Sequence, residues 1–237
     1  MSEHTILDIE AVTVPGPASN VLGLTNISLQ VAGGDLVLLE PEHHVETVSL
    51  YDVASGLIDP VEGAVRFDGV DWRRMGLYRS CAQRVRIGRI FAVEGWVSNL
   101  SMYENIALAQ RHHTYRRDPD LRRAALALLE RIGLHDCLDQ RPHMLSRGQR
   151  RRAQWVRAFM GTPDLLLLNA PLLDVRPEDH APLVALMTEA RTRGAAVVWK
   201  SREAAALLQR PGFEAARYGV LSGGALEIKR ANDRSAA

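Results

Sequence analysis

The sequence has no long apolar run: no stretch reaches the roughly 18 uninterrupted apolar residues that a membrane-spanning helix needs. Its first 14 residues hold no basic segment followed by an apolar core, so we expect no secretory signal. Cysteine is also scarce. Cys81 and Cys137 do not make a disulfide framework, and we expect both to be free thiols in a reducing compartment. Any link to a membrane is therefore expected to go through a partner subunit.

An excess of one charge is missing too, because 29 Lys and Arg face 28 Asp and Glu, which leaves a net charge of +1. This balance argues against nucleic-acid binding by the chain as a whole, so we expect no nucleic-acid partner. A local patch is still conceivable at the basic run Arg147, Arg150, Arg151 and Arg152. We favour the alternative that this run is the solvated face of a helix.

What the sequence does contain is an alternation of short apolar segments with helical patterns. The bare apolar run at 165–169 is typical of a strand buried on both faces, which favours a parallel sheet. The pattern between residues 99 and 143 turns helical, so an α/β protein with a helical insert is predicted. Strands are expected at 6–14, 26–32, 35–40, 61–72, 85–91, 165–169 and 195–199, and helices at 47–57, 121–132 and 182–192.

Several motifs in a fixed order carry a family resemblance. LSRGQ at 145–149 is followed by TPDLLLLNAP at 162–171, and it is preceded by IGRIF at 87–91 and NLSMYENI at 99–106. Over residues 7–227 the chain resembles the ATP-binding subunits of ABC transporters. The resemblance implies an α/β fold: a P-loop NTPase-like core with a largely parallel sheet, an antiparallel β subdomain and an inserted helical subdomain. We expect the core at 1–92 and 156–228, the helical subdomain at 93–155 and a disordered tail at 229–237.

The segment Leu145-Ser146-Arg147-Gly148-Gln149 departs from the family signature only at Arg147. Ser146 and Gln149 have the spacing of a capping box, and a helix N-terminus with free N–H groups attracts anions. The resemblance implies that this segment faces the γ-phosphate of an ATP held by the opposite subunit. The alternative interpretation is a helix cap and nothing more.

The phosphate-binding loop of the family is replaced here by Glu40–Thr47, of which only Pro41 and Thr47 fit the pattern. Its glycines, which let successive N–H groups turn toward phosphate, are all missing. Glu46 stands where the resemblance implies a lysine. Two unit charges about 4 Å apart interact by about 4 kcal/mol at an effective dielectric of about 20. Repulsion in place of attraction therefore costs several decades of affinity, and ordinary Mg·ATP binding is not expected.

The other positions that the resemblance implies for ATP chemistry are altered in the same way. The Asp that binds Mg²⁺ and the Glu that polarises water correspond to Asn169 and Ala170. The expected Gln is Ala92, and the expected His is Lys200. No catalytic residue is therefore intact, and an aromatic residue for adenine is missing near Val14–Gly16.

Two smaller hypotheses concern charged and metal-binding side chains. Glu46 and Lys200 replace two groups that point at the same phosphate in the family, so they could form an ion pair, or they could be unrelated charges. His43 and His44, beside Glu42 and Glu46, invite a zinc-site interpretation. Adjacent side chains rarely converge on one ion, so we expect no metal there.

Three functions remain open. The first is a degenerate half of a heterodimer that donates its signature to an intact ATPase subunit, with ATP and Mg²⁺ bound only in that composite site. The second is a non-catalytic homodimeric scaffold or regulator on membrane permease subunits. The third is a metal-binding protein on a repurposed fold. In the first two, the chain is expected on the cytoplasmic face of the membrane. Trp96, Leu100 and Tyr103 are then expected either at the permease contact or packed within the helical subdomain.

Overall fold

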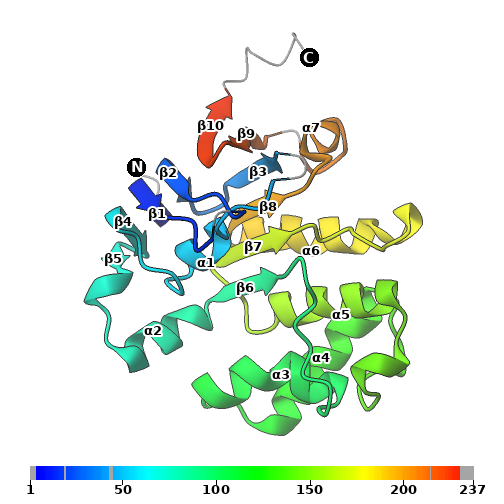
Figure 1. The fold of residues 1–237 in the computed structure, drawn as a ribbon. Helices are drawn as coiled ribbons and strands as arrows, with labels where there is room; N and C mark the ends of the chain where they lie inside the picture. The colour runs from blue at the N-terminus through cyan, green and yellow to red at the C-terminus, as the bar shows by residue number, and fades with distance from the viewer. Residues whose placement is uncertain (1–3, 19, 43–44, 214, 230–237) are drawn as a thin grey trace.

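The computed structural model describes residues 4–18, 20–42, 45–213 and 215–229 (Figure 1). Within these residues it contains two sheets and several helices, and no helix is long and apolar enough to cross a membrane. The strands are β1 (Thr5–Val14), β2 (Leu24–Ala32), β3 (Leu36–Pro41), β4 (Glu62–Phe67), β5 (Val70–Asp71), β6 (Ile87–Ile90), β7 (Leu165–Asn169), β8 (Ala196–Lys200), β9 (Arg217–Ser222) and β10 (Ala225–Lys229).

The larger sheet has the order β10-β9-β3-β8-β7-β6. Every neighbouring pair in it is parallel except β9 with β10. The predicted largely parallel sheet is therefore confirmed, and it puts the carboxyl ends of β3, β8, β7 and β6 along one edge. The smaller sheet is antiparallel in the order β2-β1-β4-β5. Asp68 and Gly69, both at positive φ, form the predicted tight turn between β4 and β5.

The helices include one clear departure from the sequence-based expectation. The predicted helix 47–57 is only α1 (Leu50–Ala54), capped by the side chain of Ser49. The preceding residues pair with a distant loop, as described below, and this pairing keeps them extended. The other helices are α2 (Leu77–Arg84), α3 (Met102–His113), α4 (Asp118–Arg131), α5 (Arg147–Phe159), α6 (Ala181–Thr192) and α7 (Ala204–Leu207), with 3₁₀ turns η1 (Trp72–Arg74), η2 (Pro142–Met144) and η3 (Pro177–Asp179).

Two hydrophobic clusters lie on opposite faces of the parallel sheet. Because side chains alternate along a strand, Leu36 and Leu38 of β3 join one cluster while Val37 and Leu39 join the other. The first cluster extends into α3, α4, α5 and α6, and the second holds α1 and the antiparallel sheet. In Figure 1, α3, α4 and α5 gather beyond β6 as a helical layer, and α5 continues past the predicted boundary at 155 to Phe159.

Candidate functional site

The candidate site is assembled from the carboxyl ends of three neighbouring parallel strands. Lys200 at the end of β8 pairs in register with Leu39 of β3 on one side and with Asn169 of β7 on the other. The next residue, Ala170, donates its backbone N–H to Lys200 O at 2.8 Å. Three of the predicted degenerate positions, Asn169, Ala170 and Lys200, therefore do lie together, at the edge where α/β proteins bind their ligands.

Lys200 does not pair with Glu46. No ion pair joins the two in the part of the chain that the structure describes, so that hypothesis is wrong. The Lys200 ammonium lies over the Tyr51 ring, 5.6 Å from its centroid. Burial lowers the pKa of Lys200, and the nearby negative charge of Asp52 opposes this shift. The Glu46 side chain, by contrast, is exposed.

Tyr51 packs against Lys200 and is held in place by backbone carbonyls of β7 and β8. The Tyr51 hydroxyl donates to Val198 O at 2.9 Å and approaches Leu168 O at 3.3 Å, so it bridges β8 and β7 from below. The side chain is 3% exposed, and burial raises its pKa well above the usual value. The Tyr51 hydroxyl is therefore neutral and engaged with backbone carbonyls, and its ring lies against Lys200, which stands where the resemblance implies a histidine.

The segment that replaces the phosphate loop is held by backbone pairing at both of its ends. Glu42 donates its N–H to Leu221 O at 2.8 Å. On the other side, Leu22 donates to Glu46 O at 2.9 Å and Val48 donates to Leu22 O at 2.9 Å, with Thr47 bridged to Leu22. Residues 46–48 are therefore extended against the β1–β2 connection and cannot also form the first turn of a helix.

The acidic side chains at the start of this segment are also bound. Glu40 Oε2 accepts hydrogen bonds from Ala205 N and from the Tyr218 hydroxyl, both at 3.0 Å. Burial, followed by this carboxylate, raises the pKa of Tyr218 to about 12. Glu42 Oε2 accepts from Gly223 N at 2.7 Å and from the Ser222 hydroxyl at 3.1 Å. Both carboxylates tie the segment to the C-terminal hairpin.

An ion pair that the sequence interpretation missed joins α1 to β6. Arg89 Nη2 lies 2.6 Å from Asp52 Oδ1, and its Nη1 donates to the Ser55 hydroxyl at 3.1 Å. The Arg89 side chain is 13% exposed, and its guanidinium stacks over Phe91 with 4.6 Å to the ring centroid. Asp52 is thus the carboxylate whose charge opposes the lowering of the Lys200 pKa, and it is already paired with Arg89.

The segment after β6, which contains Ala92 in place of the expected Gln, is fixed by side chains of α5. Arg151 donates to Phe91 O at 2.6 Å and to Ala92 O at 3.0 Å, and Gln154 Oε1 accepts from Phe91 N at 2.9 Å. Arg151 is 2% exposed, and burial lowers its pKa. The interpretation of this basic run as a solvated helix face is therefore wrong for Arg151.

Two further arginines of α5 hold the same segment. Arg150 pairs with Glu94 at 2.5 Å. Arg157 donates to Glu94 O and Gly95 O, and its guanidinium stacks on Trp96 with 4.3 Å to the centroid. Burial lowers the pKa of Arg157 to about 10. Together these contacts attach the segment 91–96 to the helical layer without a nucleotide.

The signature segment 145–149 begins α5 as predicted. Ser146 Oγ accepts from Gln149 N at 3.2 Å, and Gln149 Oε1 accepts from Ser146 N at 2.9 Å, which confirms the capping box. Leu145 is buried, and a Cβ on Gly148 would lie 2.7 Å from Asp174 O. Arg147 is exposed, with no ion pair in the described part of the chain. Packing by itself therefore explains Leu145 and Gly148 but gives no reason for the exposed Arg147.

The donor chemistry of the strand-end site is poor for a hydrated magnesium ion. Mg²⁺ prefers carboxylate oxygens, whereas Asn169 offers an amide and Ala170 offers no side-chain donor. Within the described residues, no group of three or more His, Cys, Asp or Glu side chains is placed to hold a metal ion. The predicted candidates His43 and His44 lie outside the described residues.

A cavity of about 320 Å³ lies between the parallel sheet and the helical layer. Its walls include Ile87 and Gly88 from β6 and Ile106 and Leu108 from α3. The predicted contact residues do not line it. Tyr103 is 6% exposed and donates its hydroxyl to Asp118 O, so its assignment to a contact surface is wrong. Trp96 and Leu100 are half-buried, and Trp96 packs against the core under Arg157.

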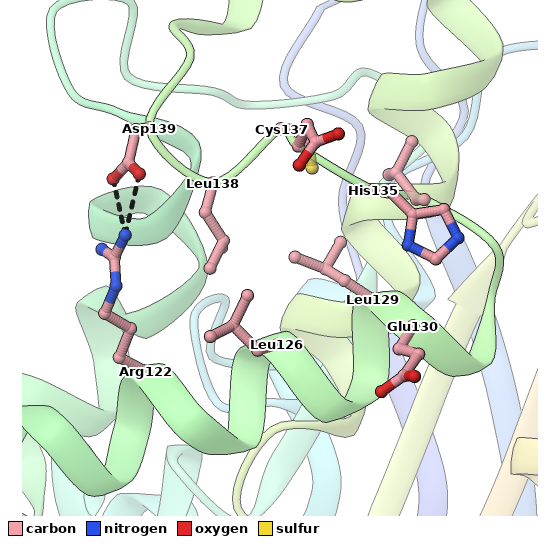
Figure 2. Close-up of a pocket in the computed structure, with 10 residues that line it drawn as sticks. Arg122, Leu126, Leu129, Glu130, His135, Cys137, Leu138 and Asp139 are labelled. Atoms are coloured by element: carbon pink, nitrogen blue, oxygen red, sulfur yellow. Dashed lines mark hydrogen bonds and ion pairs between the residues drawn. The ribbon is translucent and has the colours of Figure 1, made fainter.

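A second cavity of about 500 Å³ is confined to the end of α4 and the connection that follows it (Figure 2). Leu126, Leu129 and Leu138 point into it, and Arg122 pairs with both oxygens of Asp139 at its rim. Cys137 is a free thiol, 2% exposed, and burial raises its pKa to about 11. The thiol is therefore protonated and unreactive at neutral pH.

A sequence comparison identifies the family of this chain. The sequence profile of the ABC transporter family matches residues 48–172, just over half of the chain. The chain belongs to the ABC transporter family. The match begins directly after the segment 40–47, where the phosphate loop would be.

Curated relatives within the ABC transporter family act in different transport systems. The chain is 32% identical to "Phosphonates import ATP-binding protein PhnC 1" of Rhodopseudomonas palustris (strain BisB18) over 174 residues, which is 70% of this chain and 64% of the relative. It is 28% identical to "Intermembrane phospholipid transport system ATP-binding protein MlaF" of Haemophilus influenzae over 162 residues, or 68% of this chain and 61% of the relative. The chain thus spans less than two thirds of these relatives.

Solved structures of ABC proteins share the fold. "Structure of ATP binding subunit of ABC transporter" matches with a TM-score of 0.79 at 19% identity, over 96% of this chain and 91% of the other. "Dimeric Structure of MJ0796, a Bacterial ABC Transporter Cassette" gives the same TM-score and identity over 95% of this chain and 99% of the other. The P-loop NTPase-like α/β fold that the resemblance implied is therefore confirmed.

The Asp52–Arg89 pair should contribute more to stability than an exposed pair of the same type. We expect Asp52→Ala to lower the free energy of unfolding by about 2–3 kcal/mol, because it leaves a largely buried guanidinium without its carboxylate. The matched control is Asp139→Ala, whose carboxylate is 79% exposed where it meets Arg122 (Figure 2). This change should cost less than about 1 kcal/mol. Urea unfolding measures both, and equal losses would contradict a special role for Asp52.

Proposed function

We propose that this chain is an ATP-binding-type subunit of an ABC transport complex whose own site does not hold Mg·ATP. The single observation that carries the proposal is the extended pairing of residues 46–48 with Leu22. A phosphate loop works by turning successive N–H groups inward around the anion, and Val48 N–H already donates to Leu22 O. The exposed Glu46 adds negative charge where a polyphosphate would lie.

The electrostatics around Lys200 support the same proposal. Lys200 ends β8 beside Leu39 and Asn169, and it lies half-buried with its ammonium over the Tyr51 ring. Arg89 is bound to Asp52 and Ser55 and is therefore occupied by the chain's own groups. Both of these cations are therefore engaged with other groups of the same chain rather than free to neutralise a nucleotide phosphate.

We propose further that residues 145–149 complete an ATP site on a homologous partner subunit. The segment keeps the capping box at the start of α5, and the exposed Arg147 forms no ion pair with any of the described residues. A guanidinium at that position can bind phosphate oxygens with two parallel hydrogen bonds. The MJ0796 cassette is a dimer, which makes subunit pairing a reasonable basis for this proposal.

Attachment to integral-membrane permease subunits follows from the same family membership. The cavity between β6 and α3 is our proposed docking groove, lined by Ile87, Gly88, Ile106 and Leu108. It lies beside the segment 91–96 that α5 holds in place. The chain would then reside at the cytoplasmic face of the membrane through those subunits. Its relatives serve phosphonate import and phospholipid transport, and the cargo here depends on the permease.

The first prediction of the proposed function is that the purified chain does not bind Mg·ATP. Isothermal titration calorimetry with millimolar nucleotide should give no binding heat, and the melting temperature should not change. The MJ0796 cassette, whose solved form is a nucleotide-bound ABC dimer after hydrolysis, serves as the positive control. A dissociation constant below about 0.1 mM for this chain would overturn the proposal.

The second prediction separates signature donation from simple helix capping. In a complex with its partner ATPase, Ser146→Ala should lower ATP hydrolysis about tenfold or more, because it removes a group that would contact the phosphate in trans. Ser101 is a matched control, since it begins α3 with a capping box of the same type, in which Glu104 stands where α5 has Gln149. Each substitution should cost about 1 kcal/mol of stability.

Because the two variants should lose similar stability, only the rate of ATP hydrolysis distinguishes the role of Ser146 from that of Ser101. If Ser101→Ala and Ser146→Ala reduce hydrolysis equally, the signature is a helix cap and the scaffold hypothesis replaces signature donation. If neither changes the rate of the complex, the same conclusion holds.

A further inference from the structure

The turn between α3 and α4 carries a basic and aromatic surface that the nucleotide site does not use. We define the 111–117 turn as the segment RHHTYRR, which ends α3 and leads to the first residue of α4. Tyr115 at its tip is 107% exposed, the most exposed large hydrophobic side chain in the described part of the chain. An aromatic ring that contacts nothing in its own chain is available for a partner.

The charge of this region is strongly one-sided. Residues 111–123 contain five arginines and two aspartates, a formal charge of +3 in a chain whose total is +1. Arg111 pairs with Asp118 at 3.2 Å, and Arg117 and Arg123 share Asp120. Arg116, next to Tyr115, has no ion pair within the residues described. Its backbone N–H contacts only the Thr114 hydroxyl, at 3.3 Å.

The ion pairs that do exist are weak competitors for an external anion. Arg117 and Arg123 are 82% and 74% exposed, and their pairs with Asp120 are solvated surface pairs that contribute little. Arg122 is set apart, because it is held by both oxygens of Asp139 (Figure 2). Arg116 and Arg117 therefore remain able to turn toward an anionic surface beside the Tyr115 ring.

We propose that the 111–117 turn binds the anionic headgroups of a lipid membrane. Arginine forms paired hydrogen bonds with phosphate, basic side chains are attracted to anionic leaflets, and a tyrosine ring is stable at the headgroup level. The position of the turn fits this partner. It directly follows Leu108, Ala109 and Gln110 of α3, which line the cavity between the sheet and the helical layer. A subunit docked in that cavity by a membrane protein would face the bilayer with this end of α3.

The lipid contact goes beyond the proposed function, and only the orientation of the turn toward the bilayer rests on the proposed docking groove. Binding of the turn to vesicles needs neither a nucleotide nor a partner ATPase, so a failed nucleotide or hydrolysis test leaves the vesicle test unaffected. The lipid contact also revises the sequence-based expectation that any membrane link goes only through a partner. The turn would add a direct contact that orients the chain rather than anchors it, because no helix of the described residues is long and apolar enough to cross a bilayer.

The experiment is sedimentation of the whole chain with vesicles. Vesicles of phosphatidylcholine with about one third phosphatidylglycerol should pull down the chain, whereas pure phosphatidylcholine vesicles should not. Binding should weaken as salt rises, since exposed charges are screened over about 10 Å at 0.1 M salt. Because each arginine near such a surface contributes roughly fivefold to partitioning, Tyr115→Ser with Arg116→Glu should lower it about tenfold or more.

The matched control uses the other exposed Tyr-Arg pair, Tyr78 and Arg79 of α2, where Tyr78 is 93% exposed. Tyr78→Ser with Arg79→Glu makes the same chemical change and the same change in net charge. Its vesicle binding should stay close to that of the unchanged chain. Equal losses in both variants would show a general charge effect and overturn the assignment to the 111–117 turn.

Two other results would overturn the proposal. One is the absence of binding to the anionic vesicles at low salt. The other is binding to a single-stranded DNA oligonucleotide that the Tyr115 and Arg116 changes abolish while vesicle binding is unaffected, which would assign the surface to nucleic acid instead.

Discussion

A backbone N–H that donates to a carbonyl of its own chain is not free to bind a phosphate oxygen. This constraint governs the candidate site, because Glu42 N–H is held by Leu221 O and Val48 N–H by Leu22 O. Between these two bonds the chain must cross from the end of β3 to the start of α1, so the helix begins only at Leu50. The shortened helix and the extended residues 46–48 are therefore two consequences of one pairing pattern.

Arginine side chains join the parallel sheet to α1 and to the helical layer. Arg89 ties β6 to α1, while Arg151 and Arg157 tie α5 to the segment after β6. Because these contacts need no ligand, the two parts should keep one arrangement whether or not a nucleotide is present elsewhere in the complex.

The sequence predicts the fold well, because the bare apolar strands such as 165–169 admit little besides a central parallel sheet. The family resemblance assigns Asn169, Ala170 and Lys200 to the strand-end site, and the pairing of β7 with β8 places them together there. The sequence does not predict contacts that depend on the direction of a side chain. The predicted ion pair of Glu46 with Lys200 is wrong, because the Lys200 ammonium lies over the Tyr51 ring. Arg151 was misjudged as solvated, although its spacing of four from the buried Trp155 places both on one helix face. The Asp52–Arg89 pair has no local signal, because its partners come from separate elements.

Amide hydrogen exchange tests the central claim most directly. Exchange of the Glu42 and Val48 amides can be followed by NMR in the chain alone, with and without Mg·ATP. Because both N–H groups donate to carbonyls of the chain itself, we expect them to be protected without nucleotide and unchanged when it is added. Rapid exchange of both amides that slows on addition of Mg·ATP would mean that the segment is free to close around phosphate, and it would contradict the account.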